Sequence, residues 1–304
     1  MSDEKYVLIT PAYNAEADIE KTITSVVNQT LLPQAWVIVN DGSTDKTGET
    51  IASYAERYSF IRHVEVVKDI TDIGHCFGSK VRAINRGIDI LSKESYQFIG
   101  ILDADVSFIA DYFEILISKF REAPRLGVAG GNIVQYFNGK YEKRIKEPDS
   151  VAGAVQFFSR ECYESTVGFL ELEYGGEDAI IETHARMNGY EVKTFFDLEV
   201  IHYGIVGQAS GSRIKARFEW GQMNYLVGYH ALFEFMRCLY RTAERPYMIG
   251  SIVEFSGYVF AKLRHQSPRA PYEVVGFLRK EQILKIKNVP RRLFRFLGKQ
   301  VNSI

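Results

Sequence analysis

The sequence predicts an α/β fold, with a mostly parallel central sheet between helices, followed by a helical extension. Through residues 1–212, short runs of β-branched and apolar residues alternate with segments of helical periodicity, which is typical of a parallel sheet covered on both faces. The composition is 46% hydrophobic over 304 residues, enough for a large core. Residues 213–304 are instead basic and carry aromatic residues at helical spacing. We therefore expect a sheet domain at 1–212 and a separate helical extension at 213–304.

The first two units of the predicted sheet domain each consist of a strand and a helix. Tyr6–Thr10 is a short β-rich run, and Asn14–Asp18 then offers caps for an amphipathic helix. Trp36–Asn40 is a second buried strand, after which Thr44 or Asp45 can cap the next helix. The later elements repeat this alternation. The further predicted strands are Ile61–Val67, Ile99–Leu102 and an apolar strand that ends at His202, and Ser150–Glu161 is predicted as a strand followed by a helix start. The further predicted helices start near Gly78 and after Gly176.

Two carboxylates follow directly after the strand at Ile99–Leu102. Asp103 and Asp105 are two residues apart, so their side chains point to the same side of an extended backbone. Two such acids repel one another unless a cation lies between them, and carboxylate oxygens suit Mg²⁺ or Mn²⁺. A solvated turn is the alternative, because Asp is common in turns. Ligands of parallel sheets bind beyond the carboxyl ends of the strands, so Thr10, Asp41 and Asp103 should converge.

Five short motifs occur in order along this domain. They are Thr10-Pro-Ala-Tyr-Asn14, Val39-Asn-Asp-Gly-Ser-Thr-Asp45, Gly78-Ser-Lys-Val-Arg-Ala-Ile-Asn-Arg-Gly87, Leu102-Asp-Ala-Asp105 and Gly175-Gly-Glu-Asp178. No G-x-G-x-x-G follows the first strand, which excludes a dinucleotide-binding dehydrogenase. Together the motifs resemble the family 2 glycosyltransferases of the GT-A fold, the fold of nucleotide-diphospho-sugar transferases. The resemblance is to bacterial, non-processive members that build surface polysaccharides.

The resemblance implies that a sugar is transferred from a nucleotide donor, with a UDP-sugar expected, to a hydroxyl with inversion at the anomeric carbon. Asp41 can accept hydrogen bonds from a pyrimidine N–H, and Thr10 and Tyr13 can frame the ring by bonding and stacking. The alternative for Asp41 is a turn at a helix start. Asp103 would face the ribose and the metal's water shell, and Asp105 would ligate the metal directly.

Lys80 and His202 extend this predicted donor site. Lys80 lies where a helix start could approach the diphosphate, although lysines are also common on plain surfaces. His202 ends an apolar strand and resembles the family's third metal-site residue, although a lone His is more often structural. The cofactor implied is Mg²⁺ or Mn²⁺.

The acceptor side is predicted from the Gly-Gly-Glu-Asp motif. Glu177 and Asp178 lie at a helix N-terminus, where acids are favoured by the helix dipole alone. The resemblance nevertheless implies that Asp178 is the general base and that Glu177 binds or orients the acceptor. Gly153, in a strand of small residues, could leave room for the acceptor, although a close strand crossing would explain it equally well.

The charge distribution separates the two parts of the chain. From Arg213 onward, 17 Lys and Arg stand against 6 Glu, a net charge of +11, and residues 1–212 carry −12. The amphipathic segments Phe277–Lys287 and Pro290–Lys299 suit an interfacial helix on an anionic membrane surface. A helical cap over the sheet domain or a homodimer interface is the alternative. Nucleic acid is not expected as a partner, because the front half lacks any nucleic-acid-binding signature.

Location and reaction type follow from the same features. Cys76, Cys162 and Cys238 have no disulfide-like or zinc-like spacing, and the N-terminus reads as a strand start without a signal peptide. We expect a cytoplasmic enzyme, peripheral on the inner face of the cell membrane, that acts on a saccharide or polyprenyl-linked acceptor. Arg217-Phe-Glu-Trp220 does not match the Gln-x-x-Arg-Trp element of processive synthases, which favours single addition. The alternatives are a sugar-nucleotide-binding scaffold without turnover and a sugar-phosphate nucleotidyltransferase.

Overall fold

The computed structural model describes residues 4–66, 77–137, 139–143, 148–204, 212–243 and 247–301, with side chains up to Asn288 in the last helix. The chain divides into two compact units, Met1–Val206 and Gly207–Ile304. We call them the sheet unit and the helical unit. The division lies six residues before the boundary expected from the sequence at 212/213.

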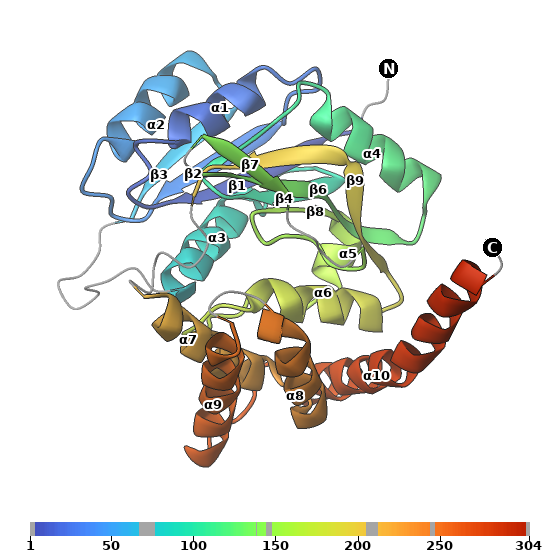
Figure 1. The fold of residues 1–304 in the computed structure, drawn as a ribbon. Coiled ribbons are helices and arrows are strands. Elements are labelled where there is room, and N and C mark those ends of the chain that lie inside the picture. The colour runs from blue at the N-terminus through green and yellow to red at the C-terminus, as the bar shows by residue number, and fades with distance from the viewer. Residues whose placement is uncertain are drawn as a thin grey trace. The chain divides into compact units, whose positions relative to one another are not determined.

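The sheet unit contains one mixed sheet in the order β3-β2-β1-β4-β8-β6-β9-β5, with β7 paired to β6 (Figure 1). Its strands are β1 (Tyr6–Ala12), β2 (Ala35–Asn40), β3 (Ile61–Glu65), β4 (Phe98–Leu102), β5 (Val106–Phe108), β6 (Leu126–Phe137), β7 (Lys140–Lys143), β8 (Val155–Ser159) and β9 (Glu191–His202). The α/β prediction is confirmed. The four strands β3, β2, β1 and β4 are parallel, whereas β8 and β5 pair antiparallel to their neighbours. The second half of the sheet is therefore mixed, because β8 joins it without a crossover helix.

Helices cover both faces of this sheet (Figure 1). The helices of the sheet unit are α1 (Ile19–Val27), α2 (Thr47–Arg57), α3 (Phe77–Leu91), α4 (Tyr112–Glu122), α5 (Arg160–Glu164) and α6 (Glu177–Met187). The apolar residues of α1, α2 and α4 belong to one core cluster with Trp36, and those of α3, α5 and α6 belong to a second cluster with Val37. Alternate residues of each strand thus enter opposite cores.

The segment before β8 differs from its prediction. We expected a strand that starts at Ser150 and leads into a helix, but β8 begins only at Val155, and residues 150–154 are irregular. The reason is a carboxylate on α6. Glu182 accepts from Ser150 Oγ and from the backbone N–H of Val151, so this segment bonds to a helix instead of a neighbouring strand.

The helical unit consists of α7 (Arg213–Val227), α8 (Ala231–Tyr240), a short 3₁₀ turn (Arg241–Ala243), α9 (Ile249–Leu263) and α10 (Tyr272–Val301). Helices α7 and α9 cross in close backbone contact. A Cβ on Gly221 would lie 1.8 Å from the carbonyl oxygen of Glu254, and one on Gly257 would lie 2.1 Å from that of Phe218. Among the described helices, none combines the length and apolarity needed to cross a membrane.

The start of α10 packs inside the helical unit. Val275 contacts the position of Gly228, and Gln282 accepts from the backbone N–H of His230 at 2.8 Å. Val274, Val275, Leu278 and Gln282 are buried. The apolar side of the predicted Phe277–Lys287 segment is therefore partly used for internal packing. Side chains of the second predicted segment, Pro290–Lys299, lie outside the described residues.

Candidate active site

Three candidate metal ligands come together where β4, β5 and β9 meet. Asp103 directly follows β4, and Asp105 directly precedes β5. Strand β5 pairs antiparallel with β9, with Val106 opposite His202, and the N–H of Tyr203 donates to the carbonyl of Asp105 at 2.9 Å. This pairing brings residues almost a hundred positions apart in the sequence side by side.

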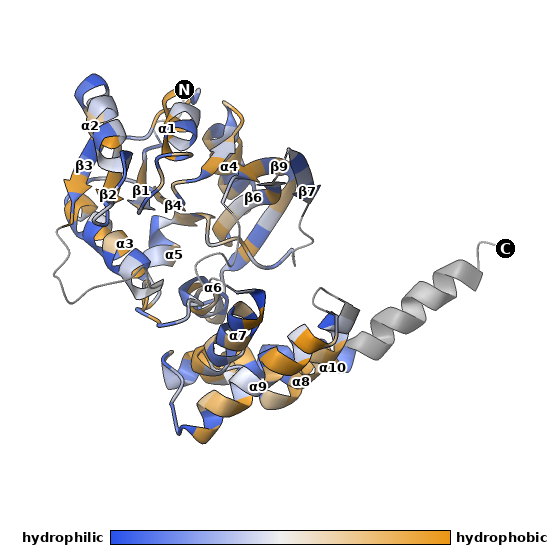
Figure 2. Cartoon of the chain, turned by 60° about the vertical axis from the view of Figure 1, so that its left-hand side comes forward, coloured by the Kyte–Doolittle hydropathy of each residue, from blue (hydrophilic) through white to orange (hydrophobic). Residues whose placement is uncertain are grey.

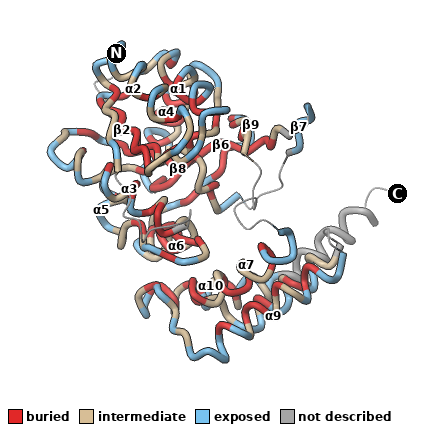
Figure 3. Tube along the Cα trace, turned by 90° about the vertical axis from the view of Figure 1, so that its left-hand side faces the viewer, coloured by how far each residue is buried: buried red, intermediate tan, exposed pale blue. Residues whose placement is uncertain are grey.

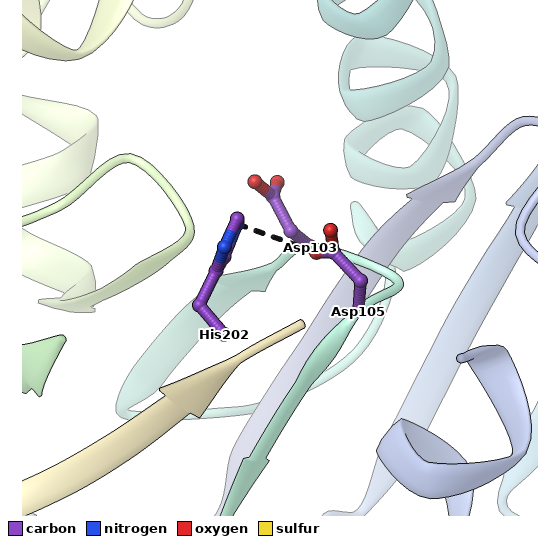
Figure 4. A group of neighbouring side chains, drawn as sticks. All are labelled: Asp103, Asp105 and His202. Atoms are coloured by element: carbon purple, nitrogen blue, oxygen red, sulfur yellow. Dashed lines mark ion pairs between the residues drawn. The ribbon is translucent and has the colours of Figure 1, made fainter. Parts of the chain in front are cut away.

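The side chains of Asp103, Asp105 and His202 point toward one another (Figure 4). Each offers one ligand atom, and these atoms all lie within 4.8 Å of one another. His202 Nε2 lies 3.5 Å from Asp105 Oδ1. Burial, and then the charge of Asp103, raise the pKa of Asp105 above its ordinary value. Two carboxylates and an imidazole in this setting fit a divalent cation, which would neutralise the repulsion.

Two further residues shape this cluster. Gln135 Nε2, on β6, donates to the carbonyl oxygens of His202, at 3.1 Å, and of Gly204, and so holds the end of β9 in place. Gly204 leaves space for the Asp105 carboxylate, because a Cβ there would lie 1.9 Å from Asp105 Oδ2. Neither residue was predicted. Gly204, two residues after His202, was the one feature of the sequence that pointed to this close approach.

Lys80 connects this cluster to the N-terminus of α6. Its Nζ lies 2.6 Å from Asp103 Oδ1. Burial alone would lower the pKa of Lys80, but the charges of Asp103, Glu177 and Asp178 outweigh burial and raise it. The ammonium therefore lies among carboxylates from β4 and α6, and the two predicted halves of the site meet around it.

The N-terminus of α6 is set by two glycines in left-handed conformations. Gly175 has φ +84° and Gly176 has φ +97°. Residues other than glycine rarely adopt such angles. With this backbone conformation, Glu177 is buried and Asp178 is half-buried. Glu177 is 7% exposed, and its Oε2 has no hydrogen-bond partner among the described residues. Burial, and then the charge of Asp178, raise the pKa of Glu177 to about 7.

Asp178 lies against the irregular segment before β8. A Cβ on Gly153 would lie 2.9 Å from Asp178 Oδ2, and Asp178 Oδ1 accepts from the N–H of Ala179 at 2.8 Å. The structure places Gly153 beside Asp178, in a turn and not in the strand that we expected. Its missing side chain makes room for the carboxylate itself.

Glu182, one helical turn after Asp178, was not predicted as a functional residue. It is 2% exposed and accepts from Val151 N at 2.8 Å, Gln156 Nε2 at 2.9 Å and Ser150 Oγ at 3.0 Å. It thereby fixes the segment that contacts Asp178. Burial, and then the charge of Asp178, raise the pKa of Glu182 to about 7. An acid at the sixth position of a helix that also carries Glu177 and Asp178 gave no separate signal in the sequence.

The predicted base-binding residues lie around the ends of β1 and β2. Asp41 is buried and accepts from Ser79 Oγ of α3. Tyr13 is partly exposed in the loop after β1. Thr10 corrects our expectation, because its side chain is fully buried and its hydroxyl accepts from Trp36 Nε1 at 3.0 Å.

The family model of Glycosyl transferase family 2 matches residues 7–213, which is most of the chain. The chain belongs to this family. The match covers the sheet unit from residue 7 onward, including the residues around Lys80 and the Gly-Gly-Glu-Asp turn, and ends at residue 213. This glycosyltransferase therefore carries the family domain in its sheet unit, and most of the helical unit lies beyond the matched region.

Named relatives of this glycosyltransferase are bacterial synthases. The chain is 26% identical over 252 residues to the poly-beta-1,6-N-acetyl-D-glucosamine synthase of Staphylococcus aureus strain COL, covering 77% of this chain and 58% of the synthase. It is 25% identical over 234 residues to the synthase of the same name from Staphylococcus epidermidis, covering 71% of this chain and 53% of that one. The chain thus spans a little over half the length of these relatives.

Solved structures share the fold at low sequence identity. The Mannosyltransferase PcManGT from Pyrobaculum calidifontis, in complex with GDP-Man and Mn²⁺, has a TM-score of 0.55 at 17% identity and covers all of this chain and 82% of its own. Staphylococcus aureus TarS 1-349 in complex with UDP-GlcNAc has a TM-score of 0.54 at 15% identity, covering 90% of this chain and 78% of its own. The fold of this glycosyltransferase is accordingly the GT-A fold, as the resemblance implied.

Proposed function

We propose that this glycosyltransferase transfers a sugar from a nucleoside diphosphate donor to an acceptor hydroxyl, with inversion at the anomeric carbon. One observation carries the proposal. The Lys80 Nζ lies 2.6 Å from Asp103 Oδ1 and within the electrostatic influence of Glu177 and Asp178, so a cation that can bind a diphosphate adjoins a carboxylate suited to act as base. Donor and acceptor chemistry then share one site.

In this proposal the acceptor oxygen attacks the anomeric carbon while the bond to the diphosphate oxygen breaks. Asp178 takes the proton of the acceptor hydroxyl, and the nucleoside diphosphate leaves with the bonding electron pair. Gly153 and the α6 helix start keep the Asp178 carboxylate in position. Glu177, held largely protonated below about pH 7 by burial, orients the acceptor by donating a hydrogen bond.

The donor side of the proposal uses the ends of β1, β2 and β4. Asp41 and Tyr13 bind the base, Asp103 faces the ribose, and Lys80 binds the diphosphate. A bound Mg²⁺ or Mn²⁺ would stabilise the charge that develops on the departing diphosphate, and Asp105 and His202 would hold it. The first donor to test is UDP-N-acetylglucosamine, because one similar structure was solved with UDP-GlcNAc and the named relatives are synthases of an N-acetylglucosamine polymer.

The acceptor in this proposal is a saccharide or polyprenyl-linked saccharide destined for a surface polysaccharide. The names of the bacterial relatives support this class. The enzyme would then work on the inner face of the cell membrane, where nucleotide sugars and polyprenyl-linked acceptors are both within reach. We further propose single additions, because Arg217-Phe-Glu-Trp220 does not match the Gln-x-x-Arg-Trp element of processive synthases.

The direct test measures nucleoside diphosphate release from a panel of nucleotide sugars, with Mn²⁺ present and with and without saccharide acceptors. Asp178→Asn should bind donor like the wild type but transfer roughly 10²–10⁴ times more slowly, the usual contribution of a positioned acid–base group. Asp197→Asn, the same change at an exposed position of β9, is the matched control and should transfer normally.

Transfer by Asp178→Asn at more than about a tenth of the wild-type rate would remove Asp178 from the role of base and move it to Glu177. A wild-type enzyme that binds a nucleotide sugar, yet neither hydrolyses nor transfers it, would favour the binding scaffold. Formation of a nucleotide sugar from a sugar phosphate and a nucleoside triphosphate would favour the nucleotidyltransferase.

A further inference from the structure

Exposed large apolar residues are concentrated in the helical unit. Among the described residues, the sheet unit exposes Leu32, Ile109, Tyr141 and Phe196, which are far apart in the sequence. Helices α8 and α9 expose many more, and both carry apolar stretches (Figure 2). Those of α8 are Leu232, Phe235, Met236, Leu239 and Tyr240, and those of α9 are Ile249, Ile252, Phe260 and Leu263. Each set recurs at helical spacing, so it forms one outward face.

The acidic residues of these two helices face inward. The buried positions of α8 are Glu234 and Cys238, and those of α9 are Gly250, Ser251, Glu254, Gly257, Tyr258 and Ala261. Ile252 is 65% exposed, whereas Glu254, two residues later, is fully buried. The arrangement is the reverse of a helix on the surface of a water-soluble domain, where charged residues face solvent.

Arginines neutralise the buried acids. Arg217 Nη1 lies 2.9 Å and Arg241 Nη1 lies 3.2 Å from the carboxylate of Glu254. Arg237 pairs with both acids, at 3.1 Å from Glu234 Oε2. This network uses both described acids of α8 and α9 in the interior. The outward face of these helices therefore carries no acid among the described residues.

Helices α8 and α9 present their apolar faces next to one another. The rings of Phe235 and Phe255 are 5.6 Å apart, and the side of α9 that holds Gly257 is closed by α7. Figure 3 shows buried residues along the inner side of α7 and α9 and exposed ones along the outer side of α9. The outward residues of α8 and α9 thus form one surface, which we call the α8–α9 face.

The edges of the α8–α9 face match a lipid surface. Lys262 and Arg264 are exposed at the end of α9, where they can meet anionic headgroups. Tyr240 is 87% exposed and Tyr247 is 59% exposed beside the helix ends, and tyrosine is enriched at membrane interfaces. A second copy of the chain would bring its own Lys262 and Arg264 to the same face, which opposes self-association.

We propose that the α8–α9 face is a docking surface for an anionic lipid bilayer, into which its apolar side chains insert to the depth of the headgroup region. The α9 helix has 15 residues, shorter than the roughly 20 that cross a bilayer, so it lies along the interface. Lipid binding by this face needs neither donor nor acceptor. The proposal therefore rests on the proposed function only for its biological setting, a membrane-linked acceptor.

The test is sedimentation of the full chain with phosphatidylcholine vesicles, with and without phosphatidylglycerol, in the absence of nucleotide. The double variant Leu239→Glu and Ile252→Glu should bind vesicles more weakly by about tenfold or more, since each lost side chain removes buried apolar area. Leu32→Glu with Phe196→Glu, the same change at exposed positions of the sheet unit, is the control and should bind like the wild type.

A second pair of changes separates charge from insertion. Lys262→Glu with Arg264→Glu should abolish the preference for phosphatidylglycerol while leaving residual binding that persists in salt, because salt screens only the electrostatic part. Circular dichroism melts establish that each variant folds. Donor hydrolysis by the Leu239 and Ile252 variant should stay at the wild-type rate, so loss of docking and loss of transfer are distinguishable.

Three results would overturn the proposal. They are absence of wild-type binding to either vesicle, equal binding by the wild type and the Leu239 and Ile252 variant, and a change from dimer to monomer in that variant with no vesicle binding by the wild type. The last result would assign the α8–α9 face to self-association. Light scattering coupled to size exclusion measures the oligomeric state directly.

Discussion

Replacing Glu182 by Gln should remove a large part of the pH dependence of stability of the sheet unit. The Glu182 carboxyl is 2% exposed, and its pKa is raised from 4.5 to about 7. Its Oε1 accepts from Val151 N and Gln156 Nε2, and an amide oxygen can keep both bonds. The Ser150 hydroxyl, which donates to Oε2, can rotate to accept from the amide nitrogen.

The direction follows from the raised pKa. The folded protein holds a proton on Glu182 that the unfolded chain releases above pH 4.5, so its stability is greatest below that pH and declines as the pH rises to about 7. Each pH unit between 4.5 and about 7 lowers the free energy of unfolding by about 1.4 kcal/mol. Between pH 5.5 and 8, the wild type should therefore lose about 2 kcal/mol of unfolding free energy more than Glu182→Gln.

The assay is urea unfolding at these two pH values, followed by tryptophan fluorescence. Trp36 is fully buried in β2 of the sheet unit, and Trp220 lies in the helical unit. In a Trp220→Phe background, Trp36 is the only tryptophan and its fluorescence reports unfolding of the sheet unit. Unfolding of the helical unit is then not mixed into the same transition. Glu191→Gln, at an exposed position, is the control. Parallel pH profiles for the wild type and Glu182→Gln would refute the assignment of the proton to Glu182.

Two further predictions concern the neighbouring groups. Gly153→Ala should fold but displace the Asp178 carboxylate, because the new Cβ would lie 2.9 Å from Oδ2; kcat should fall by about tenfold or more, and an unchanged kcat would show that the carboxylate position is not critical. Asp105→Ala should keep the fold but lose Mn²⁺-dependent binding of nucleoside diphosphate in calorimetric titration, since it removes a ligand from the Asp103, Asp105 and His202 cluster. Equal Mn²⁺-dependent binding in that variant would disprove the ligand role.

The alternation of strands and helices was enough to predict the fold class and the order of the elements up to β4, whereas α4, β6 and β7 were not predicted. The parallel strands β1, β2 and β4 are buried, mainly apolar runs, so they and their ends can be recognised locally. The mixed second half could not be predicted, because the direction of β8 and β5 depends on pairings between distant residues. Val106 and His202 become neighbours only through such a pairing.

The sequence predicted which residues belong to the candidate site better than it predicted what each of them contacts. Asp103, Asp105 and Lys80 follow strand ends or helix starts that the sequence marks, and they lie together. Thr10 was predicted to contact the nucleotide because its side chain is polar. In the structure its hydroxyl instead accepts a hydrogen bond from the buried indole N–H of Trp36. Glu182 was missed because a carboxylate within a helix usually faces solvent.

The close crossing of α7 and α9 changes which substitutions the helical unit can accept over evolutionary time. A single methyl group at Gly221 or Gly257 would collide with backbone atoms of the opposite helix, and backbone cannot move aside as a side-chain tip can. Outward residues such as Ile252 meet no such limit and can drift among apolar types. Recognition of this unit in distant chains should therefore depend on the spacing of its small residues and inward charges, since its larger side chains are free to vary.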